Sequence, residues 1–364
     1  MASLERISFA ELEGWPCTAI DGALDAFRRS CRDILDHGRR FSHEASFGGS
    51  RSSWLDTCRE GLAAEDARLF FEARFRPYRV VDRQRPEGLF TGYFEPQVEG
   101  SRSALSIFNV PIYSRPPDLV SFTEEERQAS GLIYGRRING KAMPYHTRQQ
   151  IEEGALAGQA REIVYLKDWA DAFFIHIQGS GRVLLEDGST LRLTYDGKSG
   201  LPYTAIGSLL VQQGAFSHGE MSMQSIRRWM AKHPREARSL MWQNQSFIFF
   251  REVQLERQEL GALGAQHVQL TPRVSLAIDR SVWMLGTPVW LDTTVPAGDE
   301  ASMTSFRNLL IAQDTGSAIK GFARGDVYWG SGDAAARIAG PMKSTGRMTV
   351  LLPHAVADEL GLAP

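Results

Sequence analysis

The segment "AQDTGSAIKGFARGDVYWGSGDAA", residues 312–335, decides how this chain is read. It places three acidic residues, Asp314, Asp326 and Asp333, among glycines and β-forming residues, with Lys320 between the first two. β-branched and aromatic residues interrupted by glycine are typical of short strands joined by tight turns. The question that this segment raises is which of its carboxylates carries out chemistry.

Other catalytic motifs are incomplete elsewhere in the sequence. The serines at 180 and 331 are flanked by glycine, but neither lies in the G-x-S-x-G of a nucleophile elbow. "GRRINGKA", residues 135–142, has the glycines and lysine of a phosphate loop, but Ala142 replaces the hydroxyl residue that would hold magnesium. The eight histidines are scattered without metal-binding spacing, and His176 is interpreted as a strand residue. We therefore expect neither a metal site nor an organic cofactor.

The composition is that of a globular protein. A chain of 364 residues with 43% hydrophobic content can bury a large core, and this length favours two domains. The net charge of -2, with acidic and basic residues interspersed, gives no polybasic face, which argues against nucleic acid as a partner. No apolar run approaches the roughly 20 residues that cross a bilayer, so we expect no transmembrane segment.

The three cysteines all lie in the first sixth of the chain. Cys17, Cys31 and Cys58 show no CxxC spacing, and their odd number leaves at least one without an intramolecular partner. We expect these side chains to fill apolar interior positions, and the sequence leaves open whether any two of them form a disulfide.

Helices are expected at the N-terminus and again past the middle of the chain. Asp21 is a candidate cap for a segment with apolar residues at helical spacing, and Gly38 is a candidate end. A second helix is expected over residues 65–75. Ser222 is a candidate cap for a later helix, and Pro234 fits the first turn of the one after it. Most other segments indicate strands, so the predicted fold class is α+β, mainly β.

Five motifs occur in a fixed order along the chain. They are "TGYFEP" (91–96), "IHIQGSG" (175–181), "YDGKSGLPYTAIG" (195–207), "SMQSIRRW" (222–229) and "QDTGSAIKG…RGDVYWGSG" (313–332). In these motifs the chain resembles the membrane-bound lytic murein transglycosylase A family, from about residue 89 onward. The C-terminal part is similar to the 3D domain, named for three aspartates, which correspond here to Asp279, Asp314 and Asp326.

The resemblance implies a double-psi β-barrel interrupted by a smaller β domain, with a groove between them that holds a glycan strand. The barrel, with N-terminal helices, is expected to take residues 1–102 and 243–364, and the insert residues 103–242. The change from a helical to a strand-like pattern at "QSFIFFRE", residues 245–252, is expected to mark the return of the chain to the barrel.

The resemblance also implies cleavage of the β-1,4 bond between N-acetylmuramic acid and N-acetylglucosamine without water. The 6-hydroxyl of the muramyl residue attacks its own anomeric carbon and gives a 1,6-anhydro product, so one acid/base serves both steps. The family pattern assigns this role to Asp326. Its pKa would have to be raised by apolar surroundings, for which Val327, Tyr328 and Trp329 are candidates.

The other charged residues of this region are interpreted as follows, with roles other than acid/base catalysis. Asp314 is expected to orient its own loop through backbone N–H groups. Asp279 is expected to accept hydrogen bonds at a barrel corner. Lys320 either holds a carboxylate or a sugar oxygen or is a solvated strand end, and Asp333 is expected to be a surface loop acid. If Asp314 were instead a base, the chain would be an inverting hydrolase; a non-catalytic wall-binding protein is the remaining alternative.

Sugar binding requires aromatic faces together with amide or hydroxyl groups. The candidates that lie in matching motifs are Thr91, Gly92, Tyr93, Gln178, Gly179 and Ser180, with Tyr203 and Trp329 as weaker ones. For Tyr93 a position in the core and one in the groove are equally open.

Localisation is where the chain departs from the family pattern. The family acts on peptidoglycan in the periplasm, and its members are often lipid-anchored to the outer membrane through an N-terminal cysteine. Cys17 follows "EGWP" rather than an apolar signal ending in small residues, so we expect no lipid anchor and no signal peptide in this chain. We expect a periplasmic monomer whose export sequence was removed or is encoded upstream of Met1.

Overall fold

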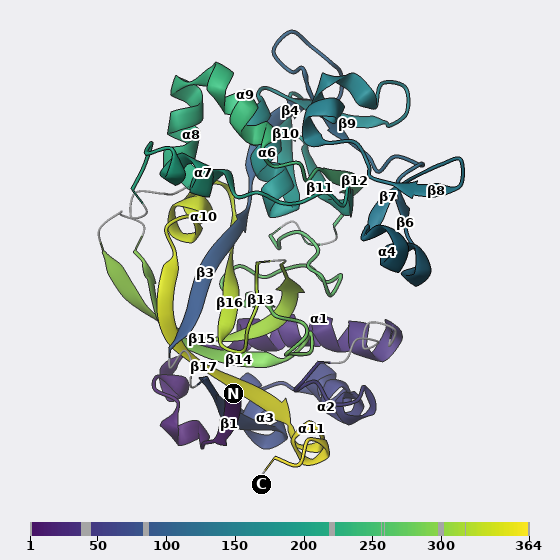
Figure 1. The fold of residues 1–364 in the computed structure, drawn as a ribbon. Helices are drawn as coiled ribbons and strands as arrows, with labels where there is room; N and C mark the ends of the chain where they lie inside the picture. Colours follow the sequence, from purple (N-terminus) through teal and green to yellow (C-terminus); the bar gives the residue numbers. More distant parts are fainter. Residues whose placement is uncertain are drawn as a thin grey trace. The chain divides into compact units, whose positions relative to one another are not determined.

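The computed structural model describes residues 2–37, 45–82, 87–217, 223–255, 257, 259–297, 302–316 and 318–362. The chain forms two compact units (Figure 1): unit 1 consists of Met1–Phe94 and Arg257–Pro364, and unit 2 of Glu95–Glu256. Unit 2 is therefore an insert that divides the sequence of unit 1 into two parts.

The expected bounds of the insert, residues 103–242, are too narrow. β4 (Gln97–Ser101) pairs with a strand of unit 2 in parallel, and β12 (Ile248–Val253) pairs with another strand of unit 2 in antiparallel. The prediction that "QSFIFFRE" re-enters the barrel is thus wrong. The strand-like pattern was identified correctly, but periodicity alone does not say which sheet a strand joins.

Six strands of unit 1 close into a barrel. Their hydrogen-bonded order is β3, β16, β13, β15, β14 and β17, and β17 pairs back to β3. Closure leaves no open edge in this ring, which removes a route to aggregation through unpaired strands. The strands are β3 (Gly88–Glu95), β13 (Ser275–Ile278), β14 (Pro288–Pro296), β15 (Met303–Thr315), β16 (Arg324–Ser331) and β17 (Lys343–Pro353).

β17 has two partners along one side. Its first residues pair with β3, and its last residues pair with β2 (Phe75–Asp82), which in turn pairs with β1 (Ala2–Arg6). The N-terminal strands therefore extend the barrel sheet. Two 3₁₀ turns, Phe9–Glu11 and Trp15–Cys17, follow β1.

Helices at the N-terminus form the α part of unit 1. They are α1 (Asp21–His37), α2 (Ser52–Ala63) and α3 (Ala67–Arg74). Asp21 is the first residue of α1 rather than its cap, and there its carboxylate is favoured by the helix dipole. Gly38 lies outside the described residues. The helix predicted over 65–75 is α3, capped by Asp66, whereas α2 was not predicted.

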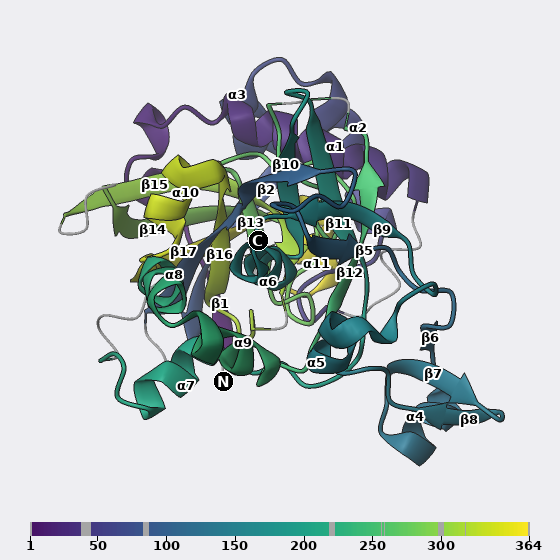
Figure 2. The same cartoon turned by 90° about the horizontal axis from the view of Figure 1, so that it is seen from above.

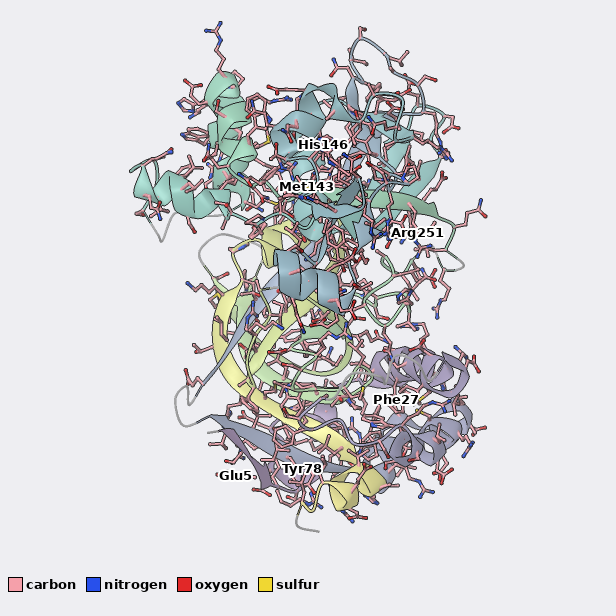
Figure 3. All side chains as sticks on the ribbon, turned by 45° about the vertical axis from the view of Figure 1, so that its right-hand side comes forward. Glu5, Phe27, Tyr78, Met143, His146 and Arg251 are labelled. Carbon is pink, nitrogen blue, oxygen red and sulfur yellow. The ribbon has the colours of Figure 1, made fainter. Side chains whose placement is uncertain are left out.

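An aromatic cluster joins α1, α3 and β2. The ring of Phe27 on α1 lies 5.6–5.8 Å from the rings of Phe70, Phe71 and Phe75. Figure 3 labels Phe27 on its helix and Tyr78 on β2, and both side chains are buried. Clustered rings of this kind contribute burial and edge-to-face contacts, which hold the helices against the extended sheet.

Two short helices complete unit 1, α10 (Gly332–Ala339) and α11 (His354–Glu359). Asp333 lies exposed in the first turn of α10, so it is a surface acid as predicted, but on a helix and not in a loop. The helix follows β16 directly, and the sequence of small residues "DAAAR" gave no apolar stripe by which to recognise it.

Unit 2 contains a six-stranded and a three-stranded sheet. The order in the larger sheet is β12, β11, β10, β4, β9 and β5, and in the smaller β6, β7 and β8. Figure 2 shows the smaller sheet together with α4. The remaining strands are β5 (Val110–Tyr113), β6 (Val120–Ser121), β7 (Tyr134–Ile138), β8 (Lys141–Met143), β9 (Glu162–Leu166), β10 (Ser180–Leu185) and β11 (Thr190–Lys198).

Unit 2 also contains more helix than the sequence indicated. Its helices are α4 (Glu124–Ser130), α5 (Arg148–Gln150), the π-helical turn η4 (Ile151–Ala155), α6 (Trp169–Gln178), α7 (Ile206–Gln212), α8 (Met223–Lys232) and α9 (Pro234–Trp242). The placement of Pro234 in the first turn of α9 is confirmed. Ser222, the predicted cap of α8, lies outside the described residues.

The strand predicted around His176 is a helix, α6. Asp168 caps it by accepting from the N–H of Asp171 at 2.8 Å, and Gly179 ends it with φ of 74°. One side of α6 is packed in the core of the six-stranded sheet, while Phe173 and Phe174 join a second core with α7, α8 and α9. A helix that is buried on several sides has no polar stripe, so its sequence resembles a buried strand.

The three cysteines differ in exposure. Cys31 and Cys58 are buried as expected, Cys17 is exposed, and all three are free thiols. Across the ranges that the structure describes, no helix is both long enough and apolar enough to span a bilayer.

Candidate functional site

Two aspartates lie on either side of Ala277 in the barrel of unit 1. Ala277 on β13 pairs with Asp326 on β16 and with Asp314 on β15. Directly paired residues project from the same face of a sheet, so both carboxylates share a face with the small Ala277 methyl group. Two strand spacings place their Cα atoms about 10 Å apart. The register of three strands thus brings together two acids that are 12 residues apart in sequence.

Asp326 is partly buried and accepts a hydrogen bond from β3. The Thr91 hydroxyl donates to Asp326 Oδ1 at 2.7 Å. Burial raises the pKa of the Asp326 carboxyl to about 6, and the nearby Asp314 charge acts in the same direction; the Thr91 hydrogen bond and the Arg324 charge oppose this rise. At mildly acidic pH the group therefore carries a proton that an ordinary aspartate would have lost.

Only part of the expected apolar environment faces Asp326. Side chains alternate along β16, so Tyr328 shares the face of Asp326, whereas Val327 and Trp329 project from the other face. The Tyr328 ring, 1% exposed, lies 5.3 Å from that of Tyr93 on β3. The two tyrosine rings therefore belong to the surroundings that desolvate this region.

Asp314 is held by three donors. The Tyr93 hydroxyl donates to Oδ2 at 2.8 Å, and the backbone N–H groups of Ala265 and Thr315 donate to Oδ1, each at 2.9 Å. Burial raises the pKa of Asp314, while these hydrogen bonds work to lower it. Three of about four acceptor positions are thus occupied. This arrangement suits a carboxylate that orients its surroundings, and it leaves little capacity to activate a water molecule.

Tyr93 keeps its proton. Burial, together with the neighbouring Asp314, raises the pKa of the Tyr93 hydroxyl well above its usual value. The hydroxyl therefore remains a donor to Asp314 over the physiological range. The bond to Asp314 and the ring contact with Tyr328 hold the Tyr93 side chain in place at the site. The sequence left open a position in the core or one in the groove, and this side chain is intermediate between the two.

Asp279 lies just after β13, where the chain turns. Its carboxylate accepts from the backbone N–H of Gly321 at 2.9 Å, from the N–H and hydroxyl of Ser281 at 3.1 and 2.7 Å, and from Lys320 Nζ at 3.3 Å. Burial works to raise the pKa of Asp279, but these donors outweigh it and hold the pKa below the usual value. Lys320 thus contacts a carboxylate, although its side chain is 62% exposed.

Gly92 and Trp329 meet on the face opposite Thr91 and Tyr93. A Cβ atom on Gly92 would lie 2.8 Å from the indole ring of Trp329 and from the Ala339 backbone, so the glycine allows the ring to lie against β3. Trp329 is buried, and its N–H donates to Met342 Sδ at 3.3 Å. The ring lacks the exposed face that a sugar contact requires, and we assign Trp329 to the core.

The remaining predicted sugar contacts belong to unit 2. Gln178 is the last residue of α6, Gly179 ends the helix with its N–H donating to Ile175 O at 2.9 Å, and Ser180 begins β10. All three are partly exposed, and Tyr203 is 56% exposed. A Cβ atom on Gly179 would meet nothing within 4 Å, so this glycine is explained by its positive φ and not by packing.

A buried polar network holds the last turn of α6. Arg148 Nη1 donates to His176 Nδ1 at 2.9 Å, and its Nε and Nη2 donate to the carbonyls of Asn244 and Ser246 at 3.0 and 2.7 Å. The Glu152 carboxylate lies 3.4 Å from Arg148 Nη1. Because arginine can only donate, His176 Nδ1 is an acceptor and the neutral ring carries its proton on Nε2. Burial, and then the Arg148 charge, lower the pKa of His176 well below its usual value.

This buried histidine predicts acid sensitivity. The folded pKa of His176 lies below the unfolded value of about 6.5, so as pH falls below about 6.5 the unfolded chain binds a proton that the folded chain does not. Stability should therefore fall by up to about 1.4 kcal/mol per pH unit from this group. Charged groups around the ring are Arg148 and, beyond it, Glu152 and Arg238.

Urea unfolding at pH 7.5 and 5.5 measures this effect, with His176→Gln as the matched variant. Glutamine can accept from Arg148 through its carbonyl oxygen but does not titrate in this range. We expect a smaller loss of stability on acidification in His176→Gln than in the unmodified chain. Equal losses in both proteins would show that other groups cause the acid sensitivity.

Sequence reasoning missed three parts of these arrangements: Arg324, the Ala265 N–H and the Arg148 network. Arg324 could have been found, because it lies two residues before Asp326 in a strand-like segment and so shares its face. Ala265 and Arg148 reach their partners across 49 and 28 residues of sequence, and no local pattern encodes such contacts. Among the described side chains, no three His, Cys, Asp or Glu residues gather as metal ligands.

Comparisons with known proteins bear on both units. The chain matches the MltA specific insert domain over residues 89–251 and the 3D domain over residues 274–352. A membrane-bound lytic murein transglycosylase A of Vibrio cholerae is 33% identical over 263 residues, which are 71% of this chain and 64% of that protein. The match thus spans less than two thirds of the length of this relative.

Solved structures extend the likeness to nearly the whole chain. A membrane-bound lytic murein transglycosylase from Agrobacterium tumefaciens has a TM-score of 0.86 and 31% identity, with 98% of this chain and 99% of that chain covered. The structure of Escherichia coli MltA with bound chitohexaose has a TM-score of 0.68 and 28% identity over 92% and 91% of the two chains. On these matches, the chain belongs to the membrane-bound lytic murein transglycosylase A family.

Proposed function

We propose that this protein is a peptidoglycan lytic transglycosylase that cleaves the bond between N-acetylmuramic acid and N-acetylglucosamine and leaves 1,6-anhydromuramyl ends. The observation that carries the proposal is the contrast between two acids on one barrel face. Asp326 has a pKa raised to about 6 and, among the described residues, a single hydrogen-bond donor, whereas Asp314 is engaged by three. One free acid is what an intramolecular displacement needs.

The proposed reaction uses Asp326 twice. The protonated carboxyl first donates its proton to the glycosidic oxygen as the bond from that oxygen to C1 of the muramyl residue breaks. The 6-hydroxyl of the same residue then bonds to C1, and the Asp326 carboxylate removes the hydroxyl proton. The acid is regenerated and no water is consumed. A pKa of about 6 suits both steps, because each protonation state is accessible near neutral pH.

A glycan is the proposed partner, and the protein is proposed to be a monomer. Support comes from the Escherichia coli relative, whose structure holds chitohexaose. In unit 1, Thr91 and Tyr93 are the proposed contacts near Asp326; in unit 2, they are Gln178, Gly179, Ser180 and Tyr203. We further propose that the closed barrel has the double-psi crossing, and that the protein acts in the periplasm in association with the outer membrane.

Product analysis tests this function directly. Purified peptidoglycan is digested with the protein and the released fragments are weighed by mass spectrometry. Anhydro ends are expected, each lighter by one water than the corresponding reducing end. Reducing ends would instead indicate the inverting hydrolase, with Asp314 as its base, and a protein that binds peptidoglycan but releases no fragments would be the non-catalytic alternative.

The pH dependence of the reaction follows from the raised pKa. The first step needs protonated Asp326, so kcat/KM should fall as pH rises above about 6. The rate of fragment release at low substrate concentration, measured from pH 4.5 to 8.5, gives this decline of kcat/KM with rising pH. A decline centred near pH 4, where an ordinary aspartate titrates, would contradict the assignment of Asp326 as the acid.

A further inference from the structure

Asp326 is linked to a cation through the hydroxyl of Thr91. Arg324 Nη2 donates to Thr91 Oγ1 at 2.8 Å, and Thr91 Oγ1 donates to Asp326 Oδ1 at 2.7 Å. Arg324 and Asp326 are two residues apart on β16 and project from the same face, while Thr91 lies on the neighbouring strand β3. The three side chains therefore form a chain of hydrogen bonds across two adjacent strands.

The direction of these hydrogen bonds is fixed by chemistry. A guanidinium has only donors, so the Thr91 oxygen must accept from Arg324. A hydroxyl has a single proton, and with its oxygen occupied by Arg324 this proton is available for Asp326 Oδ1. Arg324 is itself held in place, because its Nη1 donates to the carbonyls of Gly325 and Leu89. The bond from Arg324 thus occupies one acceptor position of the hydroxyl oxygen and favours the orientation in which the proton points to Asp326 Oδ1.

The two oxygens of Asp326 are consequently different. Oδ1 accepts from Thr91, and a proton on Oδ1 would make it a weaker acceptor for this hydrogen bond. Within the described residues, Oδ2 has no hydrogen-bond donor, and it is not among the buried polar atoms that lack a partner. An oxygen that is neither bonded nor sealed from the surface is the one on which a proton can reside and be exchanged.

We propose that Arg324 is a positioning residue, which orients the Thr91 hydroxyl so that Asp326 carries and transfers its proton on Oδ2. The oxygen that gives the proton to the glycosidic oxygen and later takes one from the 6-hydroxyl is then the same, and it faces away from Thr91. This inference rests on the proposed function for its catalytic meaning, but the hydrogen bonds from which it is argued do not depend on whether the chain cleaves peptidoglycan.

The relay is tested by the pKa of Asp326 itself. The protein is labelled with ¹³C at aspartate carboxyl carbons, the Asp326 signal is identified by its absence in Asp326→Asn, and the titration is followed by NMR. Thr91→Val removes a hydrogen bond to the carboxylate, and Arg324→Met removes both the orienting donor and a nearby positive charge. Each change should raise the Asp326 pKa by about one unit, and Thr91→Ser should leave it near the unmodified value.

The double variant distinguishes a relay from a charge that acts through space. If Arg324 acts partly through Thr91, then Arg324→Met should shift the pKa less in a Thr91→Val background than in the unmodified chain. Equal shifts in both backgrounds would overturn the relay. Thr91→Val is nearly isosteric and keeps the proposal falsifiable if Arg324→Met does not fold, because an unchanged pKa in Thr91→Val alone also overturns it. Arg307→Met, which removes an arginine paired with Asp292, is the control and should not move the Asp326 pKa.

A kinetic measurement then connects the relay to the reaction. At a pH where Asp326 is protonated in every variant, Thr91→Val and Arg324→Met should release fragments roughly 10-fold more slowly, because the proton is no longer held on one oxygen, while Thr91→Ser restores the rate. An unchanged rate in both would overturn the positioning role. If the unmodified chain releases no anhydro fragments, the proposed function fails, whereas the NMR cycle still decides whether the relay exists.

Discussion

Asp326→Asn should lower the release of anhydro fragments by at least 10²–10⁴-fold, the range that general acid–base catalysis contributes. The amide keeps the shape of the side chain but has no proton of suitable acidity for the leaving oxygen, and it cannot remove the proton of the 6-hydroxyl. Both steps are therefore affected. The measurement is the initial rate of fragment release per folded molecule, with binding to insoluble peptidoglycan measured in parallel and expected to persist.

Asp314→Asn is the matched control. Its carboxylate accepts three hydrogen bonds from Tyr93, Ala265 and Thr315, and an amide can accept only through one oxygen. We expect this variant to lose about 1–3 kcal/mol of unfolding free energy and to retain more activity than Asp326→Asn. A folded Asp326→Asn with near-normal release, together with an inactive Asp314→Asn of normal stability, would transfer the acid/base role to Asp314.

The Asp326 variant should also change stability, in the opposite direction. The folded pKa of about 6 exceeds the unfolded value of about 3.9, so the folded chain binds this proton more tightly. The stability that this proton provides is lost as pH rises through about 6, and at pH 7.5 the partly buried charge costs about 1–3 kcal/mol. Asn carries no charge, so Asp326→Asn should raise the thermal midpoint at pH 7.5 and have little effect at pH 4.

Arg148→Leu should destabilise the protein by about 3–5 kcal/mol. The guanidinium is 1% exposed and lies 4.8 and 5.1 Å from the rings of Phe173 and Phe247. Its loss leaves the Asn244 and Ser246 carbonyls without their donor and the Glu152 carboxylate without one of its two arginine neighbours. Urea unfolding followed by circular dichroism gives the change in unfolding free energy.

An exposed arginine in the same unit provides the comparison. Arg102 pairs with Glu252 through two hydrogen bonds of 2.6 and 2.7 Å, yet its side chain is 46% exposed. Arg102→Leu should therefore cost less than about 1 kcal/mol, because solvent screens the pair. If Arg148→Leu were no more destabilising than Arg102→Leu, the buried network would not be what holds the last turn of α6.

The sequence predicted the mainly-β class and part of the helices, and it failed both for short helices such as α4 and for the buried helix α6. α8 and α9 were predicted from the candidate cap Ser222 and from Pro234, whereas α6, apolar on several sides, was taken for a strand. Its capping residues, Asp168 and Gly179, were the signal that outweighs the apolar run. The misplaced β12 has a different origin, since pairing partners depend on the whole topology and not on local periodicity.

The candidate site was predictable only where the family motifs reach. Asp326, Asp314 and Thr91 lie in matching motifs, and the structure brings them onto one face of the barrel through the strand register. The direction of the hydrogen bond from Thr91 was not predictable, because it depends on Arg324, which reaches Thr91 across 233 residues of sequence. Trp329 also lies in a matching motif and was a candidate sugar contact, but its side chain packs in the core.

The closure of the barrel through β3 has a consequence for how the protein folds. β3 must meet β16 and β17 across a long stretch of sequence, 235 residues between Thr91 and Asp326, and unit 2 lies within that stretch. Contacts of such long separation form late, because the entropy of closing the loop is lost before they contribute. During synthesis unit 2 is complete before the barrel can close. Because Thr91 and Asp326 come from the two sides of that closure, we expect the proposed proton-transfer site to be assembled late in folding, so that an unfinished chain should lack the proposed activity.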